Sequence, residues 1–500
     1  MLGLIGIILA LIVLISMAYR GHSVLVAAPI AASIAVVFAG MPLLASYTQV
    51  FMPALGGFVI SFFPLFITGA VFGKLMSETG YAQAISTAIV ERLGADRAVL
   101  ATVVTGAILT YGGISVFVVA FGLFPIAREL FRAADIPRRL IPATMALGCF
   151  TFTMSALPGS PQVQNTIPTA YFGTTTFAAP LAGLVASVLI FTLGYMWIMY
   201  RVRRLQKRGE TFESMRTGER KRRFFGKKRQ ATAASSGGHA NSSATTTTLT
   251  KERPQSGATV ENDLPERPPQ NAIIAIIPLV LVIGLNLALS QWLLPAMNAD
   301  YLETDEYGNT TISQVAGLWS VVVAILVAIA FIFVVNMKSG RQLVDSVHEG
   351  AKNSVVPIFS TASEVGFGSV VAAMPAFLVI RDGLLSMSGN PLVTTSVATT
   401  TLAGITGSAS GGMSIALEAF GENLRTMAVD QGVSLELMHR MTSIAAGGLD
   451  TLPHSGAIVT LFLICGVTHR QGYKDFGMVT IVIPLLVVPV LILLAMAGLL

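Results

Sequence analysis

Two stretches of this sequence combine helix-breaking residues with polar side chains inside long apolar runs. The first, SALPGSPQVQN, covers residues 155–165, and the second, GGLDTLPHSG, covers residues 447–456. Proline removes a backbone donor and interrupts a helix, so each stretch predicts a broken helix. Backbone groups freed at membrane depth find partners only in protein or in a wet cavity. Both stretches are therefore expected to line a binding site.

The first stretch offers hydrogen-bonding groups without charge. A half-helix that begins after the break exposes N–H donors and partial positive charge, which suit an anion such as a carboxylate. The polar side chains can add hydrogen bonds to substrate hydroxyls. The substrate-binding residues predicted here are Ser155, Gly159, Ser160, Gln162 and Asn165.

The second stretch adds ionisable side chains, which inside a membrane indicate a functional site. Asp450 has two interpretations: it takes a coupling proton, or it caps the half-helix that follows. His454 can donate to a carboxylate or carry a proton near neutral pH. Thr451 and Ser455 are predicted to contact the substrate.

Two further segments, 97–131 and 393–428, each consist of two short apolar arms around a Gly-Gly pair. We expect re-entrant hairpins, because glycine lets the backbone reverse and approach a ligand closely. The alternative is that the small residues only let helices pack tightly. The substrate-binding residues predicted at these tips are Gly112, Gly113, Ser115, Ser408, Ser410, Gly411 and Gly412.

Two glutamates lie within apolar surroundings. Glu364 is either a proton site or is held by hairpin hydroxyls, and we include it among the predicted proton-coupling residues with Asp450 and His454. Glu418, in the outgoing arm of the second hairpin, is a weaker candidate that can face an aqueous gap.

The composition requires lipid as the solvent for these motifs. The chain has 500 residues, of which 53% are hydrophobic and 12% charged, and its mean hydropathy is +0.71. A soluble domain of this size cannot bury so much apolar surface, so we predict an all-α polytopic membrane protein. The expected spans are 2–19, 23–45, 56–74, 140–172, 177–200, 272–295, 313–336, 353–372, 434–467 and 475–499, with 140–172 and 434–467 broken.

The basic residues are concentrated in one segment. Residues 201–270 hold 16 of the 32 lysines and arginines, so the net charge of +6 does not indicate a nucleic-acid partner. The positive-inside rule puts this segment in the cytoplasm. Its low complexity predicts a disordered linker. It is a simple tether or, alternatively, a polybasic segment that binds anionic lipid.

An internal repeat relates the two halves of the chain. GGIS at 112–115 matches GGMS at 411–414, and LPGSP at 157–161 resembles LPHSG at 452–456. AFG also recurs, at 120–122 and 419–421, and the three matches keep the same order with nearly constant spacing.

The repeat divides the chain into residues 1–200, the linker 201–270 and residues 271–500. Each half holds about five spans and one hairpin, and an odd number of spans turns the second half upside down. Inverted repeats with broken helices at matching positions are typical of secondary transporters, whose substrate site lies at the midplane.

Other functional classes explain the pattern less well. An intramembrane serine hydrolase would use His454 as its base, but GSASG at 407–411 has Ala409 where a nucleophile elbow has serine. A channel would require a filter motif, which we do not find, and a primary pump would require a P-loop, which is absent from the sequence. No cofactor or metal is expected. Sodium remains an alternative coupling ion to the proton.

The repeat plan, the two broken-helix motifs and the Gly-Gly hairpins together resemble the gluconate:proton symporter (GntP) family of the ion transporter superfamily. The resemblance covers the chain outside 201–270 and is closest to the short hydroxy-acid (3-hydroxybutyrate-type) permeases. It implies proton-coupled import of a small hydroxylated monocarboxylate across a bacterial inner membrane. It also implies a homodimer in which a transport domain moves as an elevator against a fixed scaffold.

Overall fold

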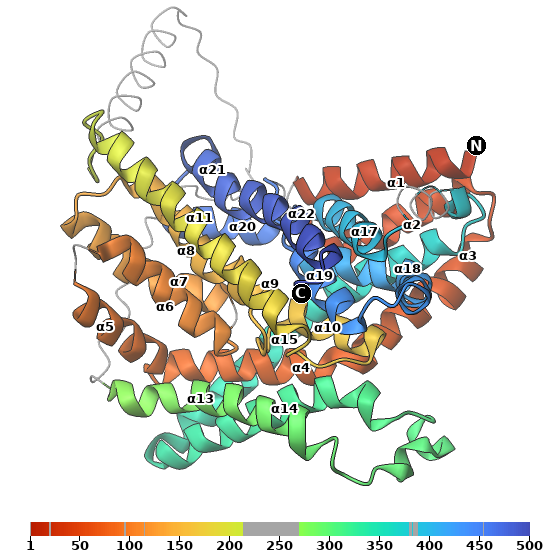
Figure 1. The fold of residues 1–500 in the computed structure, drawn as a ribbon, viewed down its shortest axis with the longest axis horizontal. Helices are drawn as coiled ribbons and strands as arrows, with labels where there is room; N and C mark the ends of the chain where they lie inside the picture. Colours follow the sequence, from red (N-terminus) through yellow and green to blue (C-terminus); the bar gives the residue numbers. More distant parts are fainter. Residues whose placement is uncertain are drawn as a thin grey trace, which may run out of the picture.

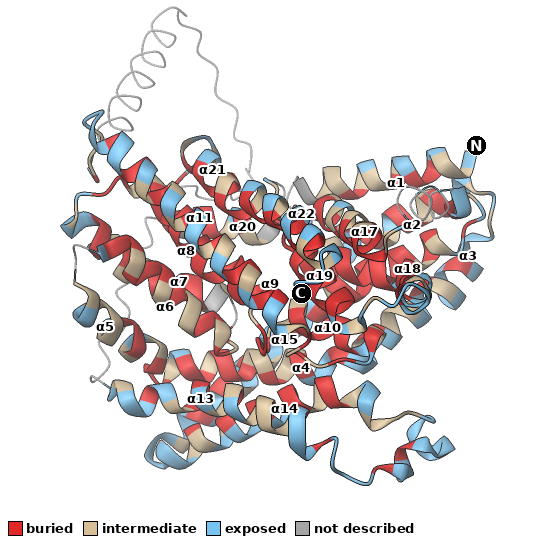
Figure 2. Ribbon diagram, in the orientation of Figure 1, coloured by how far each residue is buried: buried red, intermediate tan, exposed pale blue. Residues whose placement is uncertain are grey.

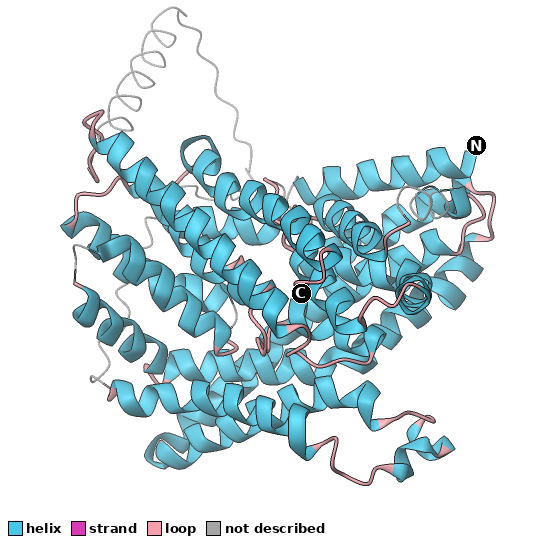
Figure 3. Cartoon of the chain, in the orientation of Figure 1, coloured by secondary structure: helices cyan, strands magenta, loops and turns pink. Residues whose placement is uncertain are grey.

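The computed structural model describes residues 2–19, 22–94, 97–114, 116–213, 270–379, 383, 389–453 and 455–500. Within these residues the chain forms helices and loops and no strand (Figure 3). Six helices in this described part are long and apolar enough to cross a membrane, and shorter apolar helices accompany them. The prediction of an all-α polytopic membrane protein is therefore confirmed at this level.

The first half of the chain ends in one long helix, α11. Its described helices are α1 (Leu2–Tyr19), α2 (Val24–Phe38), α3 (Leu43–Ser46), α4 (Met52–Glu78), α5 (Tyr81–Leu93), α6 (Ala98–Tyr111), α7 (Val116–Ala133), α8 (Ile141–Cys149), α9 (Phe152–Ser155), α10 (Val163–Phe172) and α11 (Pro180–Gln206).

The second half follows the same plan. Its described helices are α13 (Ala272–Ala288), α14 (Ile312–Val335), α15 (Gly340–Ala372), α17 (Pro391–Thr406), α18 (Ala409–Asp430), α19 (Leu435–Ala446), α20 (Gly456–Cys465), α21 (His469–Gly477) and α22 (Ile483–Met496). Each half thus has a long third span, a helix pair in the place of the predicted hairpin, and two short helices separated by a break.

The two long spans, α4 and α15, pack against each other and contact the outer helices. α4 lies along α15, α2 packs on α15, and α14 packs on α4. In Figure 1, α4 and the pair α13 and α14 occupy the lower part of the molecule, while α11 and α22 cross its front. Figure 2 shows that α8, α10 and α19 are mostly buried, whereas α1, α13 and α14 have broad exposed faces. The short broken helices therefore lie inside the protein and the continuous apolar helices form its surface.

Prolines are accommodated by local widening of the helices. A π-helical turn at Tyr47–Phe51 joins α3 to α4 just before Pro53, and another at Met478–Val482 precedes Pro484. Proline cannot donate the usual backbone hydrogen bond, and a π-turn lets the helix continue past it. The chain from 43 to 78 is consequently one span rather than the shorter 56–74 that hydropathy predicted.

The second predicted span is shorter than expected. It was predicted over 23–45, but α2 ends at Phe38, and Gly40 follows with a φ of +68°. This left-handed conformation terminates the helix and redirects the chain. The amphipathic helix α5 was missed because its apolar content is too low for a span.

The hairpin segments form the helix pairs α6 with α7 and α17 with α18. In the first pair Gly112 and Gly113 form the turn, with a φ of +92° at Gly113. In the second pair the turn is at Gly407, with a φ of +67°, and Ser408 caps α18. Gly411 and Gly412 therefore lie inside α18, and their expected place at the tip of the hairpin is wrong. A Cβ at Gly412 would overlap the backbone of Ala403, so this glycine permits close helix packing.

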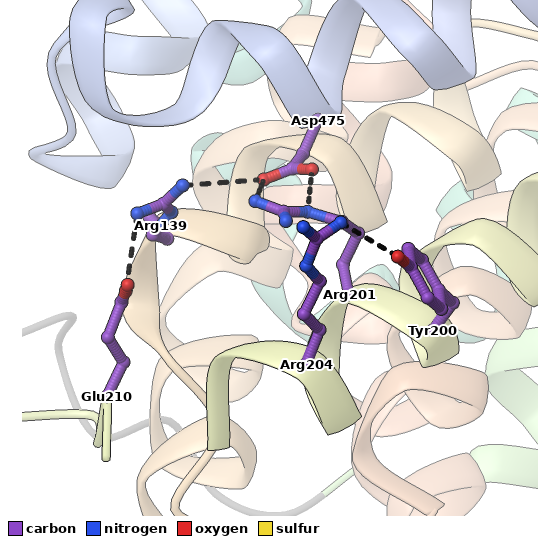
Figure 4. Close-up of polar contacts among 6 residues, drawn as sticks. All are labelled: Arg139, Tyr200, Arg201, Arg204, Glu210 and Asp475. Carbon is purple, nitrogen blue, oxygen red and sulfur yellow. Dashed lines mark hydrogen bonds and ion pairs between the residues drawn. The ribbon is translucent and has the colours of Figure 1, made fainter. Parts of the chain in front are cut away.

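The first residues of the predicted linker 201–270 belong to helix α11. α11 continues to Gln206, and Arg201 is buried, with Nη2 3.1 Å from Oδ2 of Asp475 (Figure 4). Arg139 binds Glu210 at 3.2 Å and approaches Asp475 at 3.9 Å. Arg201 binds both carboxylate oxygens of Asp475, through Nε and Nη2, and such a two-pronged pair fixes the end of α11 relative to α21. Residues 214–269, the rest of the predicted linker, lie outside the described residues.

Candidate functional site

The two broken helices lie side by side. We define the first break as residues 156–162, between α9 and α10, and the second break as residues 447–455, between α19 and α20. Both α9 and α10 pack against α19, and the Ser443 hydroxyl donates to the carbonyl of Gln164 at 2.6 Å. A Cβ placed on Gly447 would lie 3.4 Å from Oγ of Ser155. These contacts place Gly447 of the second break and the end of α19 against the helices on either side of the first break.

The polar side chains of the first break bind backbone carbonyls. Ser155 donates to Thr151 at 3.2 Å, and Ser160 donates to Thr153 at 2.8 Å. The Nδ2 of Asn165 donates to the carbonyls of Ser160 and Thr176, at 2.8 and 2.9 Å. These three predicted ligands are buried and engaged, so in this conformation they hold the break together.

Gly159 is covered by the loop that follows α10 and by helix α13 of the other half of the chain. Its N–H donates to the carbonyl of Thr176 at 2.9 Å, and its carbonyl accepts from Asn286 of α13 at 3.2 Å. Gly159 has a φ of +79°, and a Cβ there would overlap the ring of Phe177. Only glycine fits this position, because both the conformation and the space exclude a side chain.

The first hairpin turn rests on the first break. The Tyr111 hydroxyl donates to the carbonyl of Pro158 at 2.6 Å, and a Cβ on Gly113 would lie 3.1 Å from Cγ of Pro161. Gln162 reaches in the opposite direction and donates to the carbonyl of Thr110 at 2.7 Å. Gly112 packs against Leu279, while Ser115, another predicted ligand, lies outside the described residues. The turn and the break therefore support each other through backbone contacts.

Sequence reasoning missed two fully buried side chains, His439 and Arg440 of α19. The Nη1 of Arg440 donates to Oδ1 of Asn165 at 2.7 Å and to the carbonyl of Ser155 at 3.5 Å. Its Nε and Nη2 both donate to Ala178, at 3.0 and 2.8 Å. The arginine in LMHRMTSIAA, inside the predicted span 434–467, was the available signal, since charge at membrane depth indicates function.

His439 completes the connection between the halves. Its Nδ1 lies 2.7 Å from the Thr174 hydroxyl, and its Nε2 lies 3.4 Å from Oδ1 of Asn165. His439 and Arg440 thus both reach from α19 to the segment that surrounds the first break. The first break is held by side chains of the other half of the chain.

The second break differs from the first because it contains a buried carboxylate with one oxygen that no described residue binds. Asp450 is 6% exposed, and its Oδ1 has no hydrogen-bond partner among the described residues. Thr451 donates to the Thr480 hydroxyl at 2.8 Å, and the carbonyl of Thr451 accepts from Tyr473 at 3.0 Å. Ser455 is buried at the start of α20, and His454 lies outside the described residues. A buried carboxylate oxygen without a partner is costly, so such a group is a strong candidate for ion or proton binding.

Helix α17 covers the second break. Thr400 donates to the carbonyl of Ala445 at 2.9 Å, and a Cβ on Gly404 would lie 2.9 Å from Cβ of Leu449. The Asp450 side chain does not act as the N-terminal cap of α20, because the capping position is Ser455. This observation argues against the capping interpretation of Asp450.

Glu364 lies against the second hairpin. It is 2% exposed, its Oε2 has no hydrogen-bond partner in the described chain, and its carboxylate occupies the space that a Cβ on Gly411 would fill. Gly411 donates its N–H to Ser408 at 3.1 Å, and the Ser408 and Ser410 hydroxyls are 3.4 Å apart. Glu364 therefore meets the first turn of α18, where partial positive charge favours a carboxylate.

Glu418 is exposed rather than enclosed. Its carboxylate accepts from the Tyr171 hydroxyl of α10 at 3.3 Å and from Ser369 of α15 at 3.5 Å. These contacts link α18 to the helix after the first break. Within the described residues, no group of three or more His, Cys, Asp or Glu side chains is arranged to hold a metal ion.

Comparison with known proteins agrees with a membrane transporter. The model of the GntP family permeases matches residues 1–226. An uncharacterized transporter of Bacillus subtilis (strain 168), YxjC, is 39% identical over 503 residues, which cover 99% of each chain. The similarity thus extends through both breaks and both hairpins. With a relative this similar along its whole length and a family match over the first half, this chain belongs to the GntP family of permeases.

Proposed function

We propose that this protein is a secondary active transporter that imports a small hydroxylated monocarboxylate together with protons. The observation that carries the proposal is the pairing of the two breaks, with the unpartnered Oδ1 of Asp450 in one of them. Interrupted helices that meet in the interior of a transporter expose half-helix ends to anions and ions. The substrate class is of the gluconate or 3-hydroxybutyrate type.

Asp450 is proposed to carry the coupling proton, with Glu364 as a second proton-binding group. Each is a buried carboxylate with one oxygen free of hydrogen bonds in the described chain. Asp450 belongs to a break, whereas Glu364 belongs to the long helix α15 and contacts the hairpin helix α18. A proton can therefore influence both the substrate region and the contact between the long span and the hairpin. His454 remains a proposed participant from the sequence alone.

The substrate is proposed to bind next to the second break. Thr451 and Ser455 supply hydroxyls there, and the beginning of α20 supplies partial positive charge. In the first break Ser155, Ser160 and Asn165 bind the protein itself, so they contribute to shape rather than to direct contact in this conformation. At the hairpin tips, Ser408 and Ser410 are half-buried and therefore more accessible to a substrate than the buried Ser155 and Ser160.

We also propose that the halves 1–200 and 271–500 are inverted repeats that support an elevator mechanism. Helix contacts correspond between the halves: α10 packs on α18 of the second half, and α20 packs on α7 of the first half. The long helices α4 and α15 would form the scaffold, and the hairpins with the broken helices would move. A homodimer in a bacterial inner membrane, with a cytoplasmic linker, completes this proposal.

The test is uptake into proteoliposomes of labelled gluconate, glycerate, lactate and 3-hydroxybutyrate under an imposed proton or sodium gradient. We expect accumulation of at least one acid under the proton gradient, abolished by a protonophore. Accumulation driven only by sodium would replace the proton with sodium as the coupling ion. Equilibration without accumulation would indicate a channel, and the absence of uptake for every acid would contradict the proposed substrate class.

A further inference from the structure

Two buried arginines in this protein have opposite surroundings. Arg201 at the end of α11 pairs through Nε and Nη2 with the two carboxylate oxygens of Asp475. Arg440 is 0% exposed, and its guanidinium contacts only neutral oxygens, namely Oδ1 of Asn165 and the carbonyls of Ser155, Thr176 and Ala178. Among the described residues no carboxylate forms an ion pair with Arg440.

The charge of Arg440 is therefore only partly compensated. Arginine stays protonated in proteins, and burial of a charge without a counter-charge is costly. Carbonyl dipoles solvate the guanidinium but do not cancel its charge. The nearest carboxylate along α19 is Glu436, which is exposed and accepts from the N–H of Ala179 at 3.2 Å. A positive field consequently extends from α19 toward the region between the breaks.

The contacts of Arg440 also fix the shape of the first break. Nε, Nη1 and Nη2 each have acceptors, so no part of the fork is left to bind a substrate directly. Asn165 accepts from Arg440 through Oδ1, and its Nδ2 donates to the carbonyls of Ser160 and Thr176. Arg440 thereby also fixes the positions of these two carbonyls. Arg440 therefore acts on a ligand only through its field and through the groups that it positions.

We propose that Arg440 is the positioning residue of the first break and that its charge makes the site prefer an anion to a neutral molecule of the same shape. This inference rests on the proposed function and names the source of its selectivity for carboxylates. In a low-dielectric interior a fixed charge acts over several ångströms and requires no direct contact. The carboxylate of a substrate bound next to the second break would be attracted by this charge without a direct contact to Arg440.

The test compares each acid with its neutral amide, using gluconate with gluconamide and 3-hydroxybutyrate with 3-hydroxybutyramide. Inhibition of labelled acid uptake gives the affinity for both members of each pair. We expect the wild type to bind the acid at least about tenfold more tightly than the amide, equivalent to ~1.4 kcal/mol. Arg440→Gln should lose this preference and Arg440→Lys should keep it, although lysine reproduces the fork less well.

Arg201→Gln is the matched control, because it removes a buried arginine whose carboxylate partner, Asp475, belongs to α21 and not to a break. It should lower thermal stability without changing the ratio of acid to amide affinity. The inference is overturned if Arg440→Gln weakens acid and amide equally, or if the wild type does not distinguish them. If Arg440→Gln does not fold, Arg440→Lys decides, since loss of the preference in that variant also overturns the inference. Absence of uptake in the wild type would instead contradict the proposed function.

Discussion

The first and second breaks share a Leu-Pro-x-Ser pattern but use their polar groups differently. In the first break Ser155, Ser160 and Asn165 all bind backbone carbonyls within the protein. In the second break Asp450 keeps Oδ1 without a hydrogen bond from any described residue. The first break is a rigid socket that the other half of the chain holds through Arg440. The second break contains Asp450, which we propose as the proton-binding group.

Two motifs with a similar sequence therefore use their polar side chains in different ways. Both breaks need partners for the backbone groups that proline and glycine release. The first break obtains them from its own side chains and from α19. At the second break Tyr473 donates to the carbonyl of Thr451, and Thr400 donates to the carbonyl of Ala445 just before the break. Among the described residues, none of these groups binds Oδ1 of Asp450. The predictions below test this division, beginning with the largest effect.

Replacement of Asn165 by leucine should produce the largest loss of stability. The change leaves Arg440 and the carbonyls of Ser160 and Thr176 without a shared partner in a buried site. We expect the free energy of unfolding to fall by about 3–5 kcal/mol. Thermal unfolding of the detergent-solubilised protein measures this effect. A variant as stable as the wild type would show that the first break is not a rigid socket.

Asp450→Asn should separate transport from stability. Asparagine has nearly the same shape but carries no exchangeable carboxyl proton, so proton-driven accumulation should fall by about tenfold or more. The melting temperature should stay near that of the wild type, and exchange of substrate without a gradient should persist. Accumulation equal to that of the wild type would remove Asp450 from the coupling path.

Glu364→Gln should have a smaller effect on coupling than Asp450→Asn. Glutamine keeps the contact with Gly411 but removes the charge at the first turn of α18. We expect accumulation to fall by about threefold, with little change in affinity for the substrate, because Glu364 lies outside both breaks. Uptake measured under an inward proton gradient and under an outward proton gradient of the same size gives the change. A loss as complete as that of Asp450→Asn would assign the main proton site to α15.

The smallest effects should come from single hydroxyl groups, one in each break. Ser160→Ala removes the bond to Thr153, and Thr451→Val removes the bond to Thr480. Each should cost about 1 kcal/mol of unfolding free energy. Only Thr451→Val should also weaken substrate affinity, and competition against a labelled acid measures this. Equal affinity losses in both variants would indicate that the substrate contacts both breaks alike.

Hydropathy and helix-breaking residues predicted the membrane class, most spans and both breaks, since these depend on local composition. The same reasoning misplaced the second Gly-Gly pair, because Gly411 and Gly412 are required by contacts with Glu364 and Ala403 rather than by a turn. It also assigned residues 201–206 to the linker, whereas they belong to α11, where Arg201 binds Asp475, far away in sequence. Ser115 and His454, both predicted ligands, lie outside the described residues and stay predictions.

The sequence by itself determined where the helices are interrupted, because proline and glycine act on the backbone at their own positions. It also determined that lipid surrounds the chain, because apolar content is a property of composition. Only the tertiary structure decided which polar groups are already engaged. Arg440 reaches Asn165 across a separation of 275 residues, and no local pattern encodes such a contact. Whether a polar side chain in a break holds the protein or remains free for a substrate depends on partners that only folding brings together.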